Sequence, residues 1–174
     1  MPSASVFLSP QGRLAPPAFW RAYILILGAN IVLSVLGYAA GPGNALIGGI
    51  NFIGGLVLLW ATFAVFVKRL HDAGASGAWV LLIAFVWTIV VGIVALVLVS
   101  LFAGEVLQTA MDDDTYANSP QFMRNLQERT FAPMTVAMLG VNLVLGYILA
   151  ALRTESGHNA YGAPGGHDGA GDGG

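Results

Sequence analysis

The chain lacks cysteine altogether, and only 9% of its 174 residues are charged. Without cysteine, disulfides, thiol catalysis, zinc–thiolate sites and iron–sulfur clusters are excluded. An ordinary soluble domain carries about 25% charged residues, because polar groups must cover its surface. The formal net charge of -2 provides no broad basic surface, so no nucleic-acid partner is expected.

Charge is also missing from three long stretches, which together hold 101 of the 174 positions. Uncharged apolar stretches of 18 or more residues are typical of membrane-spanning helices. A transmembrane β-barrel is excluded, because its strands would alternate polar and apolar residues in segments of about 10. We therefore expect an all-α integral membrane protein and not a soluble globular fold. The stretches are 22–67, 73–104 and 130–152.

Turn signals divide these stretches into four spans. A helix needs about 20 residues to cross about 30 Å of hydrocarbon. Gly41-Pro42-Gly43-Asn44 ends the first span, and such a tight turn makes the first two helices an antiparallel hairpin. The four-helix membrane domain is predicted over 19–152, with spans at about 19–40, 45–67, 78–102 and 131–152.

The positions of Lys and Arg predict the orientation, because short loops that carry them stay in the cytoplasm. Five of the seven fall on one face, so the N-terminal segment 1–18 and the C-terminal segment 153–174 are expected to be cytoplasmic. The glycine-rich C-terminal segment is expected to be largely disordered. The extracytoplasmic loop 103–130 is acidic, with Glu105, Asp112, Asp113, Asp114 and Glu128.

Three short motifs resemble those of one protein family. Arg69-Leu70-His71-Asp72, followed by Ser76-Gly77 and Trp79, resembles the central motif of the bacterial inner-membrane family called domain of unknown function 805. Gly12-Arg13 with Phe19-Trp20 resembles its N-terminal elements, and 157–162 (Gly-His-Asn-Ala-Tyr-Gly) resembles its closing motif. The resemblance implies a small polytopic protein of the bacterial inner membrane and no established chemistry. The acidic 103–130 loop looks like an insertion relative to shorter members.

The loop between the second and third spans is the predicted functional loop. Its residues are interpreted as capping the second helix, pairing locally and touching lipid phosphates. Arg69 is expected to hold a phosphate or a carboxylate by its forked donors, and Asp72 to accept from Arg69, His71 or backbone amides. A catalytic or metal-binding dyad of His71 and Asp72 would need further ligands, so no catalytic, metal or cofactor residue is predicted. The candidate residues are Arg69, His71, Asp72, Ser76, Gly77 and Trp79.

Asn30, Asn51 and Asn142 lie inside predicted spans. An unpaired amide in hydrocarbon costs several kcal/mol, so each is expected to face another helix or a wet cavity. Interhelical hydrogen bonding is one interpretation, and a polar path lined by these amides is the other. No Asp, Glu, Lys, Arg or His lies within a span interior, which disfavours proton-coupled transport but not passive conduction.

Gly41, Gly48 and Gly55 recur every seven residues. Small residues on one helix face let backbones approach closely, so Gly48 and Gly55 are predicted to pack within the bundle or between protomers. Gly49 and Gly54 are expected on other faces.

Three functions stay open from the sequence. The first is a structural, interaction or lipid-contacting component of the bacterial inner membrane whose partners are membrane lipid, a second copy or another membrane protein. The second is a small transporter or channel component with an Asn-lined interior. An enzyme using His71 and Asp72 is the weakest of the three.

Overall fold

The computed structural model describes residues 4–164, which form six helices. Those residues contain no strand, only an isolated bridge between Asn159 and Gly162. Four of the helices are long and apolar enough to cross a membrane, which confirms the expected all-α fold with four spans. The helices are α1 (Ala4–Leu8), α2 (Pro16–Ala40), α3 (Ala45–Asp72), α4 (Trp79–Asp112), α5 (Asp114–Ala117) and α6 (Pro120–Ala150).

The turn between α2 and α3 lies at the predicted Gly-Pro-Gly-Asn sequence. Gly41 and Gly43 adopt φ angles of 75° and 85°, a region in which a side chain is strained. Asn44 then caps α3, because its side-chain oxygen accepts the N–H of Ile47 at 3.1 Å. The first two spans therefore form the expected antiparallel hairpin.

The connection between the last two spans differs from the predicted loop over 103–130. Helix α4 continues to Asp112 and α6 already begins at Pro120, so most of that region is helical. At a rise of 1.5 Å per residue, the 34 residues of α4 extend about 50 Å, well beyond about 30 Å of hydrocarbon. A helix that leaves the hydrocarbon continues where no breaker stops it and a neighbouring helix packs against it. The charged residues mark the end of the apolar span, not the end of the helix.

Helix α3 also extends past its expected end at 67, as far as Asp72. The N-terminal segment packs on its last turns and stabilises them. Lys68 Nζ donates to the Ser5 carbonyl at 2.7 Å, and the Leu14 N–H donates to the Lys68 carbonyl at 3.1 Å. The final residues of α3 are buried as a result.

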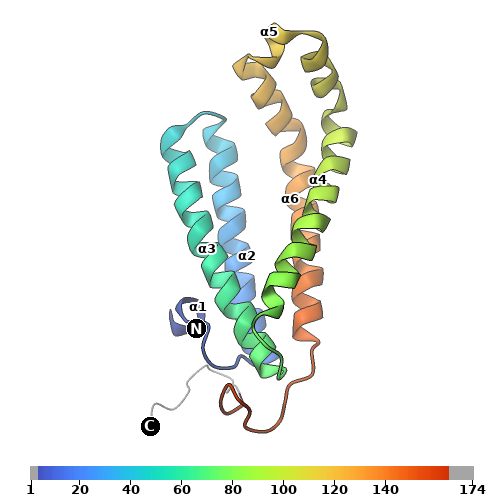
Figure 1. The fold of residues 1–174 in the computed structure, drawn as a ribbon. Coiled ribbons are helices and arrows are strands. Elements are labelled where there is room, and N and C mark those ends of the chain that lie inside the picture. Colours follow the sequence, from blue (N-terminus) through green and yellow to red (C-terminus); the bar gives the residue numbers. More distant parts are fainter. Residues whose placement is uncertain (1–3, 165–174) are drawn as a thin grey trace.

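The four long helices form two hairpins that diverge along the bundle. Helix α2 packs along α3 and α6, and α4 packs along α6, whereas α3 and α4 contact each other little. Figure 1 shows the hairpins meeting near the loop that joins α3 to α4 and separating toward α5. We call the closed end, formed by residues 12–16, 68–80 and 149–162, the motif end, and the opposite end the α5 end.

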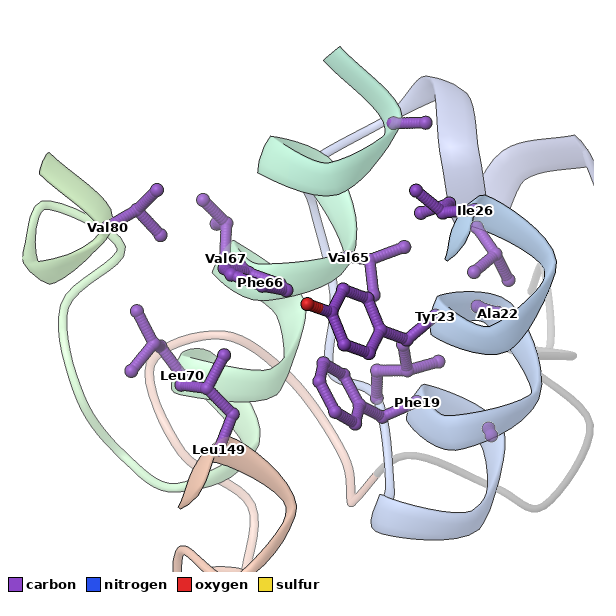
Figure 2. Close-up of a cluster of buried hydrophobic side chains, with 14 residues drawn as sticks. Phe19, Ala22, Tyr23, Ile26, Val65, Phe66, Val67, Leu70, Val80 and Leu149 are labelled. Atoms are coloured by element: carbon purple, nitrogen blue, oxygen red, sulfur yellow. The ribbon is translucent and has the colours of Figure 1, made fainter. Parts of the chain in front are cut away.

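The apolar core lies at the motif end (Figure 2). The Tyr23 ring stacks on Phe19 with centroids 5.5 Å apart and meets Phe66 at 5.4 Å. Farther along the helices many large apolar side chains are exposed, among them Leu96 at 72% and Leu101 at 72%. Such surfaces suit hydrocarbon and not water.

The C-terminal segment differs in part from the expected disordered tail. Residues 151–164 are described, and they lie against the motif end through the contacts given below. The rest of that predicted tail, 165–174, lies outside the described residues.

Candidate functional site at the motif end

A buried carboxylate, Asp72, joins three distant parts of the chain. Asp72 lies at the end of α3, and its side chain is 0% exposed. Its Oδ1 accepts from Arg13 Nε at 3.2 Å, and its Oδ2 accepts from Arg69 Nη1 at 2.6 Å and from Thr154 Oγ1 at 2.9 Å. Both arginine side chains in these ion pairs are likewise 0% exposed. Removal of either arginine or of the carboxylate would therefore leave a buried charged group without its partner.

Arg69 closes the end of α6. Its Nε donates to the Leu149 carbonyl at 3.1 Å, and its Nη2 donates to the carbonyls of Ala150 and Leu152. Together with Asp72 and Thr154, these acceptors occupy all five N–H donors of the guanidinium. A cation is stabilised at a helix C-terminus because the last carbonyls have no partner in the helix and carry partial negative charge.

Arg13 holds the C-terminal segment. Its Nη1 donates to the carbonyls of Gly157 at 2.6 Å and Gly162 at 3.3 Å. Its Nη2 donates to the carbonyls of Asp72, at 3.3 Å, and Glu155. One side chain from the N-terminal segment thus ties the closing motif to the end of α3.

His71 supports the same segment from the other side. Its ring stacks on Tyr161 with the centroids 3.7 Å apart and the planes within 4°. Its Nδ1 lies 3.2 Å from the Gly12 carbonyl, and its own carbonyl accepts from Asn159 Nδ2 at 3.0 Å. The three motifs of the family resemblance therefore meet at one place.

The rest of the predicted functional loop is more open. Ser76 is exposed, and its Oγ accepts the N–H of Ala78 at 3.3 Å. Gly77 packs closely, since a Cβ there would lie 2.9 Å from Val67 and 3.1 Å from His71 Nε2. Trp79 begins α4 and is 55% exposed. The edge of the loop from Ser76 to Trp79 is therefore its more exposed part, whereas Arg69 and Asp72 are buried.

The expected contact of Arg69 with lipid phosphate is wrong, because the guanidinium is buried and all its donors have acceptors within the chain. The alternative expectation, a carboxylate, is the one that the structure shows. The His71–Asp72 dyad does not form either. Asp72 is occupied by Arg13, Arg69 and Thr154, and His71 Nδ1 faces a backbone carbonyl. Within residues 4–164, no cluster of three His, Cys, Asp or Glu side chains is placed to hold a metal ion.

Arg13, Thr154, Asn159 and Tyr161 were missing from the predicted site. Arg13 lies 59 residues from Asp72, and Thr154 lies 82 residues from it, so no local spacing indicates either contact. The motifs around Arg13 and over 157–162 were the sequence signal for these residues. They indicated that the chain resembles the family, but not that the two motifs contact each other in the fold.

The three predicted intramembrane amides differ in their surroundings. Asn142 meets another helix, because the Tyr23 hydroxyl lies 3.1 Å from both its backbone carbonyl and its Oδ1. Asn30 is exposed, and its Nδ2 donates to the Ile26 carbonyl of its own helix at 3.0 Å. Asn51 is placed beside Gly37, and its buried Oδ1 has no partner among residues 4–164. Asn30 and Asn142 line a cavity between the hairpins, and Asn51 does not.

The predicted packing glycines, Gly48 and Gly55, face open space within the part of the chain that the structure describes. A Cβ built at Gly48 or Gly55 would meet no atom within 4 Å, whereas one at Gly54 would lie 2.8 Å from Leu33. The seven-residue spacing therefore indicated the wrong face for intramolecular packing, and contact between protomers stays a prediction. The close approach that sequence reasoning missed is Gly146, where a Cβ would lie 2.6 Å from the Tyr23 ring.

Comparisons with known proteins agree with the motif resemblance. The family model described as "Protein of unknown function (DUF805)" matches residues 7–163. The proteins named "Uncharacterized protein YiiR" from Escherichia coli (strain K12) and Escherichia coli O157:H7 are each 57% identical to this chain over 35 residues. That stretch covers 20% of this chain and 24% of each relative. No solved structure matches the chain. Since the family match extends over nearly the whole sequence, the chain belongs to the DUF805 family.

Proposed function

We propose that the protein is a non-catalytic structural or interaction component of the bacterial inner membrane. The observation that carries this proposal is the Asp72 cluster, which closes the bundle and folds both terminal segments into one surface. The polar groups of the cluster hydrogen-bond to one another and to backbone carbonyls. In this proposal the cluster therefore stabilises the conformation of the motif end and does not react with a substrate. The accessible edge beside it, Ser76 to Trp79, is where a lipid or a membrane-protein partner contacts the chain.

The motif end faces the cytoplasm in this proposal. Cations in short loops are retained on the cytoplasmic side of the membrane. Five of the seven cations lie in the segments that flank the spans at the motif end: Arg13, Arg21, Lys68, Arg69 and Arg153. The native chain has no cysteine, so single cysteines report orientation directly. We expect an impermeant thiol reagent on intact cells to label Asp113→Cys but not Ser76→Cys. The reverse pattern would show that the orientation is inverted.

A photo-crosslinking amino acid at exposed positions tests the interaction role. We expect a probe at Ser76 to capture a discrete membrane-protein adduct, or a second copy, and a probe at Leu46 near the opposite end to capture only lipid. Trp79→Ala should remove the protein adduct, whereas Phe52→Ala, an exposed aromatic on α3, should not. Identical lipid adducts at both positions, unchanged by Trp79→Ala, would leave lipid contact as the sole role of this surface.

A transport or channel role is the second candidate, because Asn30 and Asn142 line a cavity bounded by all four long helices. Ion or solute flux into liposomes containing the purified chain would support it. This candidate would be removed if the flux into liposomes that contain the native chain equalled the flux into empty liposomes, and if Asn30→Leu did not change it.

A further inference from the structure

The interior between the two hairpins is a cavity of about 990 Å³. This volume lies at the upper end of the range of about 300–1,000 Å³ that is typical of small-molecule sites. Its floor is the apolar core of the motif end, since Tyr23, Phe66 and Val80 belong to both (Figure 2). The cavity is therefore closed toward the motif end.

The cavity opens sideways, between α3 and α4. On the opposite side, Tyr38 of α2 stacks on Phe131 of α6 with ring centroids 4.1 Å apart, and Tyr23 meets Asn142 below them. Helices α3 and α4 have few contacts with each other, and Figure 1 shows them diverging from the motif end. Both helices present uncharged, apolar residues there, so the opening lies at the level of the hydrocarbon.

The lining is complementary to an uncharged amphipathic molecule. Among residues 4–164, no Asp, Glu, Lys, Arg or His lines the cavity, and most of the lining residues are apolar. A phosphate or another ion would lose its hydration there without compensation. Two polar residues of α2, Asn30 and Ser34, line the cavity with exposed side chains one helical turn apart. Amides and hydroxyls both donate and accept hydrogen bonds, so they match a hydroxyl or carbonyl group of an occupant.

We propose that the cavity binds one uncharged membrane lipid of the diacylglycerol type, which enters between α3 and α4. Its chains lie against the apolar walls, and its hydroxyl and ester oxygens hydrogen-bond to Asn30 and Ser34. An uncharged polar head can leave the bilayer surface and reach these residues at modest cost, whereas a phosphate head cannot. The site is separate from the partner surface proposed at Ser76 to Trp79, and either can exist without the other.

Tryptophan fluorescence provides the test, because Trp60 and Trp87 line the cavity. Dioleoylglycerol with brominated chains is titrated into the purified full chain in detergent. We expect quenching that saturates and is reversed by unbrominated dioleoylglycerol. Phosphatidylcholine with the same brominated chains should quench only weakly and without saturation. Equal, saturable quenching by both lipids would overturn the proposal, because the site would then not select an uncharged head.

Matched variants locate the site. Ala84 lines the cavity from α4, whereas Val86 on the same helix is exposed and does not line it. Ala84→Phe should abolish saturable quenching, and Val86→Phe should leave it unchanged. Asn30→Leu should weaken binding about tenfold, which corresponds to the loss of one hydrogen bond. Ser34→Ala, which removes one hydroxyl only, should weaken it severalfold.

Thermal unfolding of each variant separates a loss of lipid binding from a loss of folding. If Ala84→Phe does not fold, Asn30→Leu and Ser34→Ala test the site instead. The proposal would be overturned if Ala84→Phe and Val86→Phe bound brominated dioleoylglycerol with equal affinity. Equal affinity of Asn30→Leu and the native chain for this lipid would overturn it as well. Native-chain dimers that Ala84→Phe converts to monomers would show that a second copy fills the cavity, and the proposal would equally fail.

Discussion

The two ends of the bundle contain the same kind of ion pair in opposite surroundings. At the motif end, Asp72 and its two arginines have side chains that are 0% exposed. Toward the α5 end, Arg129 Nη1 lies 3.3 Å from Glu105 Oε2, and these side chains are 52% and 84% exposed. Water competes for the second pair and not for the first. Loss of one partner is therefore expected to cost far more at the motif end than toward the α5 end.

The difference has a structural consequence as well. At the motif end the charged groups hold helices and terminal segments together, and the bundle is closed. Toward the α5 end the two hairpins diverge and are bridged by the stacked rings of Tyr38 and Phe131, while polar contacts are mostly within a helix or between neighbours. A membrane helix gains little from apolar contact with its neighbour, because lipid chains are equally apolar. Specific polar contacts decide where such a bundle is tight.

Removal of the central carboxylate gives the largest expected effect. Asp72→Ala leaves Arg13 and Arg69 buried without a counter-charge, and loss of one partner of a buried pair costs about 3–5 kcal/mol. We expect the free energy of unfolding, measured by denaturation in mixed detergent micelles, to fall by that amount.

The matched control is Glu105→Ala toward the α5 end. An exposed ion pair contributes about 0–1 kcal/mol, so this variant should unfold almost as the native chain does. Similar losses in the two variants would break the comparison between the ends.

Arg69→Lys should give the next largest effect. A lysine ammonium keeps the charge near Asp72 but cannot also reach the carbonyls of Leu149, Ala150 and Leu152 with its three donors. Hydrogen bonds of charged groups contribute about 1.5–3 kcal/mol each, so we expect a loss of roughly 2–3 kcal/mol in the same unfolding measurement. Amide hydrogen exchange should increase in the last turn of α6. An unchanged unfolding curve would show that charge alone matters at this position.

Gly146→Ala tests the close approach of α6 to α2. The added methyl group would overlap the packed Tyr23 ring, and overpacking of this kind costs about 1–3 kcal/mol. Gly140→Ala on the same helix is the control, because nothing lies within 4 Å of the added atom. Gly48→Ala and Gly55→Ala should likewise leave the monomer unchanged, and a shift in their oligomeric state would reveal packing between protomers. Equal stability of the Gly146 and Gly140 variants would contradict the observed contact.

Tyr23→Phe should give the smallest effect. It removes the hydroxyl that bonds to Asn142 and keeps the ring packed on Phe19 and Phe66. Polar contacts between membrane helices contribute about 0.6–2 kcal/mol, and we expect a loss of about 1 kcal/mol on unfolding. The spacing between spin labels at the α5 ends of α2 and α6 should widen. A loss as large as that of Asp72→Ala would show that the hydrogen bond between Tyr23 and Asn142 holds the bundle closed as strongly as the buried ion pairs do.

The sequence alone determined the class of the protein, its four spans and the turn of the first hairpin. These follow from local composition, because hydrocarbon admits only segments that satisfy their own backbone hydrogen bonds. The sequence also predicted Arg69 as one possible donor to Asp72, and residues three apart lie on one helix face. The C-terminal end of α4 and the start of α6 were not predicted, because a helix can continue into water after its apolar run has ended.

Only the tertiary structure decided what the polar residues do. Arg69 was expected at a phosphate or a carboxylate. It holds the Asp72 carboxylate, and the end of α6, 80 residues away in sequence, covers it and provides further acceptors. Likewise, the periodicity that singled out Gly48 and Gly55 places residues around one helix but does not say which neighbour, if any, faces them. Hydropathy is a property of each segment. Which side chain contacts which depends on how the segments pack. It is decided by residues far apart in the sequence, and no local pattern connects them.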